Sequence, residues 1–96
     1  MTSTELALAR QLAKHPAFQW REGMRWIRDD GDSGRYPDAD PALVEGVAVP
    51  DLADSATLGG LFFEVAMAIW VDAVARNLGA GATAGEAIAR AWLAGR

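Results

Sequence analysis

Residues 50–79 limit what this chain can fold into more than any other part of the sequence. After an acidic start, apolar residues follow one another almost without interruption. Asp54 or Ser55 is a suitable N-cap for a helix, because a side-chain oxygen there accepts hydrogen bonds from the free amides of the first turn. Gly79, which closely follows Asn77, can take the left-handed conformation that ends many helices. The stretch therefore predicts one long helix that begins at Asp54 or Ser55 and runs through Asn77.

The predicted helix is apolar on almost every side. Beyond its first turn the charged residues are Glu64, Asp72 and Arg76, and their spacing places them on one narrow line. A surface helix instead has an apolar stripe opposite a wide polar face. We therefore expect packing on several sides, by the rest of the chain or by a second copy in a two-fold dimer. The residues expected to mediate self-association are Phe62, Phe63, Ile69 and Trp70.

A membrane span is the competing interpretation. Residues 55–71 reach only the lower limit of length for crossing a bilayer, roughly 17–25 residues. Glu64 lies near the middle, where a charge costs on the order of 3 kcal/mol, and no basic cluster flanks the stretch to set an orientation. The N-terminus has neither the basic start nor the apolar run of a signal peptide. We therefore expect a buried helix, no membrane and a cytoplasmic protein, which the absence of cysteine also suits.

Capping signals predict a helix near each end of the chain. Thr2 and Glu5 have the spacing of a capping box, and the helix that they begin is expected to end before His15, which precedes a proline. Thr83 and Glu86 repeat the box and begin a last helix that extends to residue 94. The connection before this helix is short, so we expect it to fold back antiparallel along the long helix.

Between the first helix and the long helix the sequence favours two strands. Residues 24–28 and 43–49 are rich in branched and aromatic side chains, which suit a half-buried sheet. The connection between them is acidic and dense in turn formers, so we expect a hairpin with a long irregular connection. The predicted fold is a single α+β domain over residues 1–96, helix-dominant, with an N-terminal helix, a β-hairpin, a long central helix and a short C-terminal helix.

The net charge of −4 is unevenly distributed. Residues 10–28 carry five basic side chains and one acidic, whereas residues 29–54 carry eight acidic and one basic. We expect the two segments to neutralise each other within the fold. Arginines interleaved with Trp20 and Trp26 would also suit stacking on a nucleic acid, but an acidic protein lacks the cations that such binding needs. We therefore expect the aromatic side chains in the core, guanidinium groups at its rim, and no direct binding to nucleic acid.

No residue pattern supports an enzyme. His15 is the only histidine, and it has no expected nucleophile beside it because the hydroxyl residues match caps and turns. The acidic run that begins at Asp30 resembles the start of a calcium loop, but its twelfth position is Pro41 where a bidentate glutamate belongs. Plain turn chemistry is the prediction here, with an irregular site that includes Asp38 and Asp40 as the alternative. We predict no catalytic residue, no metal and no cofactor.

Gly59 and Gly60 lie inside the first turns of the long predicted helix. Glycine costs roughly 1 kcal/mol per residue relative to alanine in a helix interior. The structural explanation is the close approach of another backbone, whereas the functional one is a helix N-terminus that holds an anion. We expect close packing, because no basic residue is near in sequence and Asp51 and Asp54 would repel an anion.

One phrase of the sequence resembles a known group of proteins. Residues 50–59 resemble a motif of small proteins encoded by phages and prophages of GC-rich bacteria, Pro-Asp-Leu-x-Asp-Pro-Ala-Thr-Leu-Gly. The other shared features are Trp20, Gly23-Met24 and an Ala-rich helix over residues 83–94. Ser55 stands where the group has proline, and the strand-like stretch that the group has before its last helix is missing here. The resemblance implies a viral origin and brings no assigned activity.

The leading functional hypothesis is a non-catalytic accessory protein that binds a host or phage protein. Small phage proteins without catalytic residues often block host defences, so its sharpest form is an inhibitor of a defence complex such as a CRISPR effector. The acidic connection is expected to contact a basic surface of the partner, since charge complementarity raises association rates and selects partners. The residues assigned to this contact are Asp29, Asp30, Asp32, Asp38 and Asp40. The alternatives are an oligomerising module for phage assembly and a small-ligand-binding protein.

Overall fold

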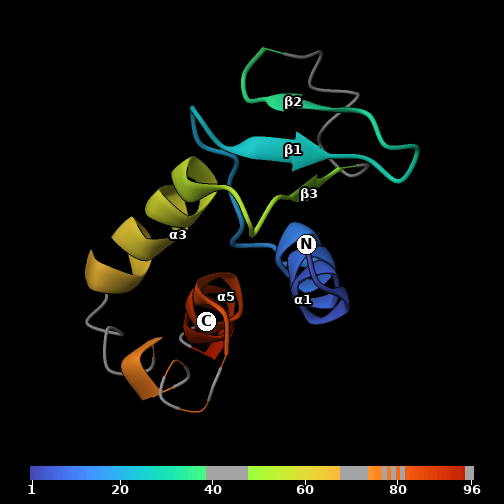
Figure 1. Cartoon of the computed structure of the whole chain (residues 1–96). Coiled ribbons are helices and arrows are strands. Elements are labelled where there is room, and N and C mark those ends of the chain that lie inside the picture. Colours follow the sequence, from blue (N-terminus) through green and yellow to red (C-terminus); the bar gives the residue numbers. More distant parts are fainter. Residues whose placement is uncertain (39–47, 68–73, 77, 79, 81, 95–96) are drawn as a thin grey trace.

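The chain folds as helices packed beside a small antiparallel sheet (Figure 1). The computed structural model describes residues 1–38, 48–67, 74–76, 78, 80 and 82–94. In chain order its elements are α1 (Ser3–Lys14), β1 (Arg25–Ile27), β2 (Ser33–Arg35), β3 (Val49–Pro50), α3 (Ser55–Met67) and α5 (Ala84–Ala94). The prediction of a helix-dominant α+β fold is confirmed.

The helices are arranged around α5. This helix packs against both α1 and α3, and α1 also contacts β3 at one edge of the sheet (Figure 1). Within the described residues the strand order is β2-β1-β3, and both pairings are antiparallel. None of the helices that the structure describes has the length and apolar character that crossing a bilayer demands.

The β-hairpin differs from the prediction. β1 pairs with β2, which lies inside the connection expected to be irregular, and Trp26 faces Gly34 in this pairing. The turn is closed by a hydrogen bond from Arg28 N to Asp32 O of 2.8 Å, and Gly31 in the turn has a φ of 89°, which only glycine adopts without strain. β2 contains Gly34, and glycine is depleted in strands, so this strand has no signal in the sequence.

The strand predicted over residues 43–49 is only partly visible. Residues 43–47 lie outside the described part of the chain. Val49 belongs to β3, which pairs with the other edge of β1 so that Ile27 faces Val49. The prediction that residues 43–49 pair with β1 is therefore correct at Val49. The second strand of the hairpin, however, is β2 and not this segment.

The predicted helix ends are mostly confirmed. Thr2 and Glu5 form a complete capping box on α1, and His15 is its C-cap. Asp54, rather than Ser55, is the N-cap of α3, because its carboxylate accepts from Thr57 N at 3.0 Å. Residues 74–76 are helical, but the predicted continuation across 68–73 and at 77 lies outside the described residues.

The hydrophobic core gathers residues from every helix and from the segment before the sheet. Its largest fully buried apolar side chains are Trp92, Leu12, Met24, Leu52, Leu61 and Val65. On α5, Ile88, Ala91 and Trp92 are all buried. Burying each large side chain of this kind contributes about 1.5–3 kcal/mol, so this core holds the helices to the sheet.

A buried carboxylate joins α1 to α5. Glu5 accepts from Thr2 N at 2.7 Å and from the Thr83 hydroxyl at 3.0 Å. Thr83 is in turn the N-cap of α5, since its hydroxyl accepts from Glu86 N at 3.2 Å. Burial raises the pKa of Glu5, but the hydrogen bonds from Thr2 and Thr83 outweigh it and leave the pKa below its usual value. A negative charge at a helix N-terminus is also favoured by the helix dipole.

The glycines of α3 and α5 have different structural reasons. A Cβ on Gly60 would lie 2.8 Å from the Met24 side chain, so this glycine allows close packing, although against a side chain rather than the predicted backbone. Gly59 has nothing within 4 Å, so the prediction of close packing is wrong there. At Gly85 the approach is closest, because a Cβ would collide with the Leu52 carbonyl oxygen and lie 2.8 Å from the Glu5 carboxylate.

We predict opposite effects for two glycine-to-alanine changes. Gly85→Ala should lower the free energy of unfolding by about 1–3 kcal/mol, because the added methyl group overpacks the junction of α1 and α5. Gly59→Ala is the matched control and should raise it by up to about 1 kcal/mol, since the site is exposed and alanine favours the helix. Urea denaturation followed by circular dichroism measures both. Equal effects at the two positions would contradict the packing described for Gly85.

Candidate functional site

Ion pairs between the basic and acidic segments organise the surface around the sheet. Arg10 pairs with Asp29 at 3.8 Å, Arg25 with Asp51 at 3.3 Å, and Arg35 with Asp54 at 2.8 Å. Arg28 pairs with Asp30 at 3.0 Å and reaches Asp32 at 3.7 Å. The predicted neutralisation of the two segments within the fold is confirmed for the pairs of Arg10, Arg25 and Arg28, whereas Arg35 and Asp54 both belong to the acidic segment.

The strongest of these pairs attaches the hairpin to the start of α3. Both terminal nitrogens of Arg35 donate to the Asp54 carboxylate at 2.8 Å, which is the bidentate geometry that favours Arg–carboxylate pairs. The Thr57 hydroxyl donates to Asp54 at 3.1 Å and accepts from Arg25 N at 2.8 Å. The guanidinium of Arg35 holds the pKa of Asp54 well below its usual range, with further help from Thr57. One carboxylate thus caps α3 and positions β1 and β2.

The acidic residues assigned to partner binding do not form one surface. Asp29, Asp30 and Asp32 are exposed in the turn between β1 and β2, whereas Asp38 is exposed beyond the far end of β2. Because β2 runs antiparallel to β1, the turn and Asp38 lie at opposite ends of the hairpin. Asp40 lies outside the described residues. The expectation of one continuous acidic connection is therefore wrong, for the reason that a strand divides it.

The exposed side of α3 carries no charge. Its exposed residues recur at helical spacing, and we call them the α3 face: Ser55, Ala56, Gly59, Phe62 and Phe63. Phe62 is 38% exposed and Phe63 is 60% exposed, which is high for aromatic side chains. Of the residues assigned to self-association, these two are therefore accessible in the single chain, while Ile69 and Trp70 lie outside the described residues.

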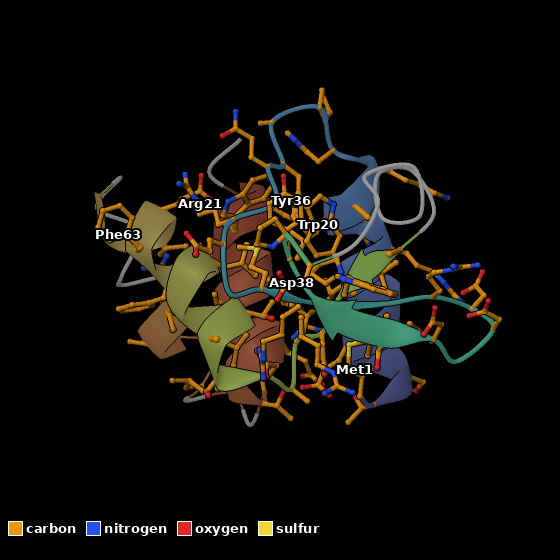
Figure 2. All side chains as sticks on the ribbon, turned by 90° about the horizontal axis from the view of Figure 1, so that it is seen from above. Met1, Trp20, Arg21, Tyr36, Asp38 and Phe63 are labelled. Carbon is orange, nitrogen blue, oxygen red and sulfur yellow. The ribbon has the colours of Figure 1, made fainter. Side chains whose placement is uncertain are left out.

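A second group of aromatic side chains lies beside the hairpin. Trp20 and Tyr36 are half-buried and stacked, with ring centroids 6.2 Å apart and planes inclined by 23°. Trp26 is 4% exposed, and both rings pack against it. Figure 2 shows Trp20 and Tyr36 together and Phe63 well separated from them, with Arg21 between the pair and Phe63 in this view. We call Trp20 and Tyr36 the aromatic pair.

A polar chain connects the segment before the sheet with α3 and α5. Arg21 Nη2 donates to Glu64 at 3.0 Å, and Trp92 Nε1 donates to the other oxygen of Glu64 at 2.9 Å. Glu64 is the carboxylate that stands alone among apolar residues in the sequence of α3. Its role is to hold α5, which explains why a charge lies within an apolar helix.

The remaining candidates for chemistry have structural surroundings. His15 caps α1, its Nδ1 accepts from Ala17 N at 3.1 Å, and its ring meets Trp92 edge-on at 5.1 Å. In the described part of the chain, no group of three or more histidine or carboxylate side chains is placed to hold a metal ion. Asp30 instead accepts from Asp32 N at 2.9 Å, which is the turn chemistry expected from the sequence.

Comparison with known proteins adds no relative. No family model matches the chain, and neither the curated proteins nor the solved structures give a match.

Sequence reasoning missed the aromatic pair and the polar chain through Glu64. The pair depends on β1 and β2, because Tyr36 N donates to Met24 O at 2.8 Å and Gly23 N donates to Tyr36 O at 2.9 Å. The available signal was the turn at Gly31, because a hairpin centred there pairs the segment that follows Trp20 with the segment that contains Tyr36. For Glu64, the signal was its isolation in an apolar helix, which favours a buried partner.

We predict that the Arg35–Asp54 pair gives the fold a dependence on pH. The pKa of Asp54 is depressed in the folded state, so the pair stabilises the fold above the unfolded-state value of about 3.9 and the contribution is lost as the pH falls through the folded-state pKa. Asp54→Asn should therefore lower the free energy of unfolding by about 1 kcal/mol at pH 7 and should flatten its decline towards pH 2.

Denaturant titrations at pH 7, 4 and 2 check this prediction. Asp29→Asn is the matched control, because its side chain is 88% exposed and its contact with Arg10 is long. This control should stay within about 0.5 kcal/mol of the original chain. If Asp54→Asn declines towards acid as steeply as the original chain, the assigned role of Asp54 is wrong.

Proposed function

We propose that this chain acts by binding another protein and carries no catalytic activity of its own. The observation that supports this most directly is the α3 face, where two exposed phenylalanines lie on a helix side without any charge. The centres of protein interfaces are enriched in aromatic side chains and depleted of charged ones. Contiguous exposed apolar surface on a small protein commonly marks such a contact.

The proposed partner is a host or phage protein. The resemblance of residues 50–59 to a phage and prophage motif favours a bacterial host protein, and a defence complex such as a CRISPR effector is the sharpest form of the proposal. The exposed carboxylates of the β1–β2 turn support a basic partner surface, although Arg28 and Arg10 already neutralise part of their charge. Charged residues at the rim of an interface raise the association rate more than they raise the affinity.

We predict that the α3 face is needed for partner capture. Phe62→Gln with Phe63→Gln removes both rings and retains a good helix former, so it should reduce the protein captured from a bacterial lysate at least tenfold. The loss of about 2 kcal/mol or more expected for aromatic anchors gives this factor. Quantitative mass spectrometry of the captured proteins is the measurement. Gln11→Ala, an exposed change on α1, is the control and should capture normally.

We predict a smaller, rate-dominated effect for the acidic residues. Replacing Asp29, Asp30, Asp32, Asp38 and Asp40 together by Asn keeps the oxygens that accept hydrogen bonds in the turn. This variant should slow association several-fold at low salt and leave the melting temperature nearly unchanged. Surface plasmon resonance with the captured partner measures the rates. Unchanged association at low salt would remove the acidic residues from the proposed contact.

Self-association is the second candidate function, because a second copy would also cover the α3 face. The exposed parts of the two phenylalanine rings amount to about 200 Å² per chain. A stable interface buries about 800 Å² per partner. The two rings can therefore form only the centre of a larger contact, whether the partner is a second copy or a foreign protein. Light scattering with the Phe62→Gln and Phe63→Gln variant distinguishes the two candidates.

A further inference from the structure

The aromatic pair presents free hydrogen-bonding groups together with its rings. Trp20 Nε1 and the Tyr36 hydroxyl have no hydrogen-bond partner in the part of the chain that the structure describes, and both residues are half-buried. Trp26, against which they pack, has a buried Nε1 that lacks an acceptor. Gly34 makes room for this indole, because a Cβ there would lie 2.7 Å from its ring. Two half-buried aromatic donors therefore lie beside a third, that of Trp26, which is buried.

The charged residues near the aromatic pair in the chain that have no ion pair within the described residues are acidic. The nearby arginines are already committed, since Arg21 pairs with Glu64 and Arg35 pairs with Asp54. Glu22 and Asp38 are exposed and have no ion pair within the described residues. Glu22 adjoins Gly23, whose amide donates to Tyr36 O, and Asp38 is placed by a 2.8 Å bond from its amide to Arg35 O. In the sequence, Glu22 thus lies two residues after Trp20, and Asp38 lies two residues after Tyr36.

We propose that the aromatic pair binds an extended, proline-containing segment of a partner protein that carries an arginine or lysine. The inference rests on the proposed function and names the chemistry of the partner. An extended polyproline segment makes no internal hydrogen bonds, so its carbonyl oxygens are free to accept from indole and phenol donors. Aromatic-lined surfaces bind such segments by packing against the proline rings.

The basic residue of the segment follows from the charge at the site. Trp and Tyr rings attract a cation placed over their faces, and the carboxylates of Glu22 and Asp38 add to this attraction. The same carboxylates repel phosphate groups, so the stacked rings do not suit a nucleic acid. A single-stranded oligonucleotide is therefore the competing ligand that the test includes.

The test is a titration of the ¹⁵N-labelled full chain followed through its tryptophan indole N–H signals. The probes are a proline-rich decapeptide with one arginine, the same peptide with glutamate in place of arginine, a glycine-serine decapeptide with one arginine, and a short single-stranded DNA. Only the first should shift the Trp20 and Trp26 signals saturably, with a dissociation constant of about 1 mM or tighter. The Trp92 signal, whose N–H is bonded to Glu64, should stay in place and report an intact fold.

Substitutions of the exposed carboxylates test peptide binding without disturbing the fold. Glu22→Gln and Asp38→Asn should each weaken binding of the arginine peptide about threefold. Asp29→Asn, an exposed carboxylate at the other end of the hairpin, is the matched control and should not change it. Tyr36→Leu should abolish binding while the Trp92 signal is unchanged.

Two outcomes would overturn the inference. One is no saturable shift at Trp20 or Trp26 with the arginine peptide, and the other is an equal shift with the glycine-serine peptide or with DNA. The proposed function is judged separately, because lysate capture through the α3 face needs no peptide bound at the aromatic pair. Capture that depends on Phe62 and Phe63 without any peptide binding would leave the proposed function standing and reject this inference alone.

Discussion

The bidentate pair between Arg35 and Asp54 is the contact on which the arrangement of the sheet and α3 depends. Asp54 caps α3, and its neighbour in the hydrogen-bond network, Thr57, accepts from the backbone of β1. A short hairpin of three-residue strands buries little surface and is marginal alone. Its attachment to a helix N-terminus through charged hydrogen bonds therefore fixes where the hairpin lies, and with it the places of Trp20 and Tyr36.

The two candidate surfaces arise from different physical causes. On α3, the side chains of Thr57, Leu61 and Val65 are buried in the fold. The residues of the α3 face, on the other side of the helix, are uncharged. The aromatic pair is instead a product of strand pairing, which brings two distant segments together. The surfaces are well separated (Figure 2), so the chain has room to contact one partner at two places or two partners at once.

Elements with a local signal could be predicted from the sequence, and elements without one could not. The capping box at Thr2 and the cap at Asp54 depend on residues three apart, so the starts of α1 and α3 were accessible to sequence reasoning. β2 contains Gly34 and follows Gly31, and neither residue favours a strand. Its formation depends on pairing with β1 and on space for the Trp26 ring, which are not local properties.

The class of the fold, the helix starts and the mutual neutralisation of the basic and acidic segments could all be inferred from the amino-acid sequence. The helix starts follow from the spacing of a few residues. The fold class and the neutralisation follow from the composition and charge of longer segments. Three features became evident only from the packed fold: β2 divides the acidic residues, Glu5 joins two helices, and Trp20 stacks on Tyr36. These contacts join residues far apart in the chain, and their free energy comes from burial and hydrogen bonds that exist only after the elements have packed.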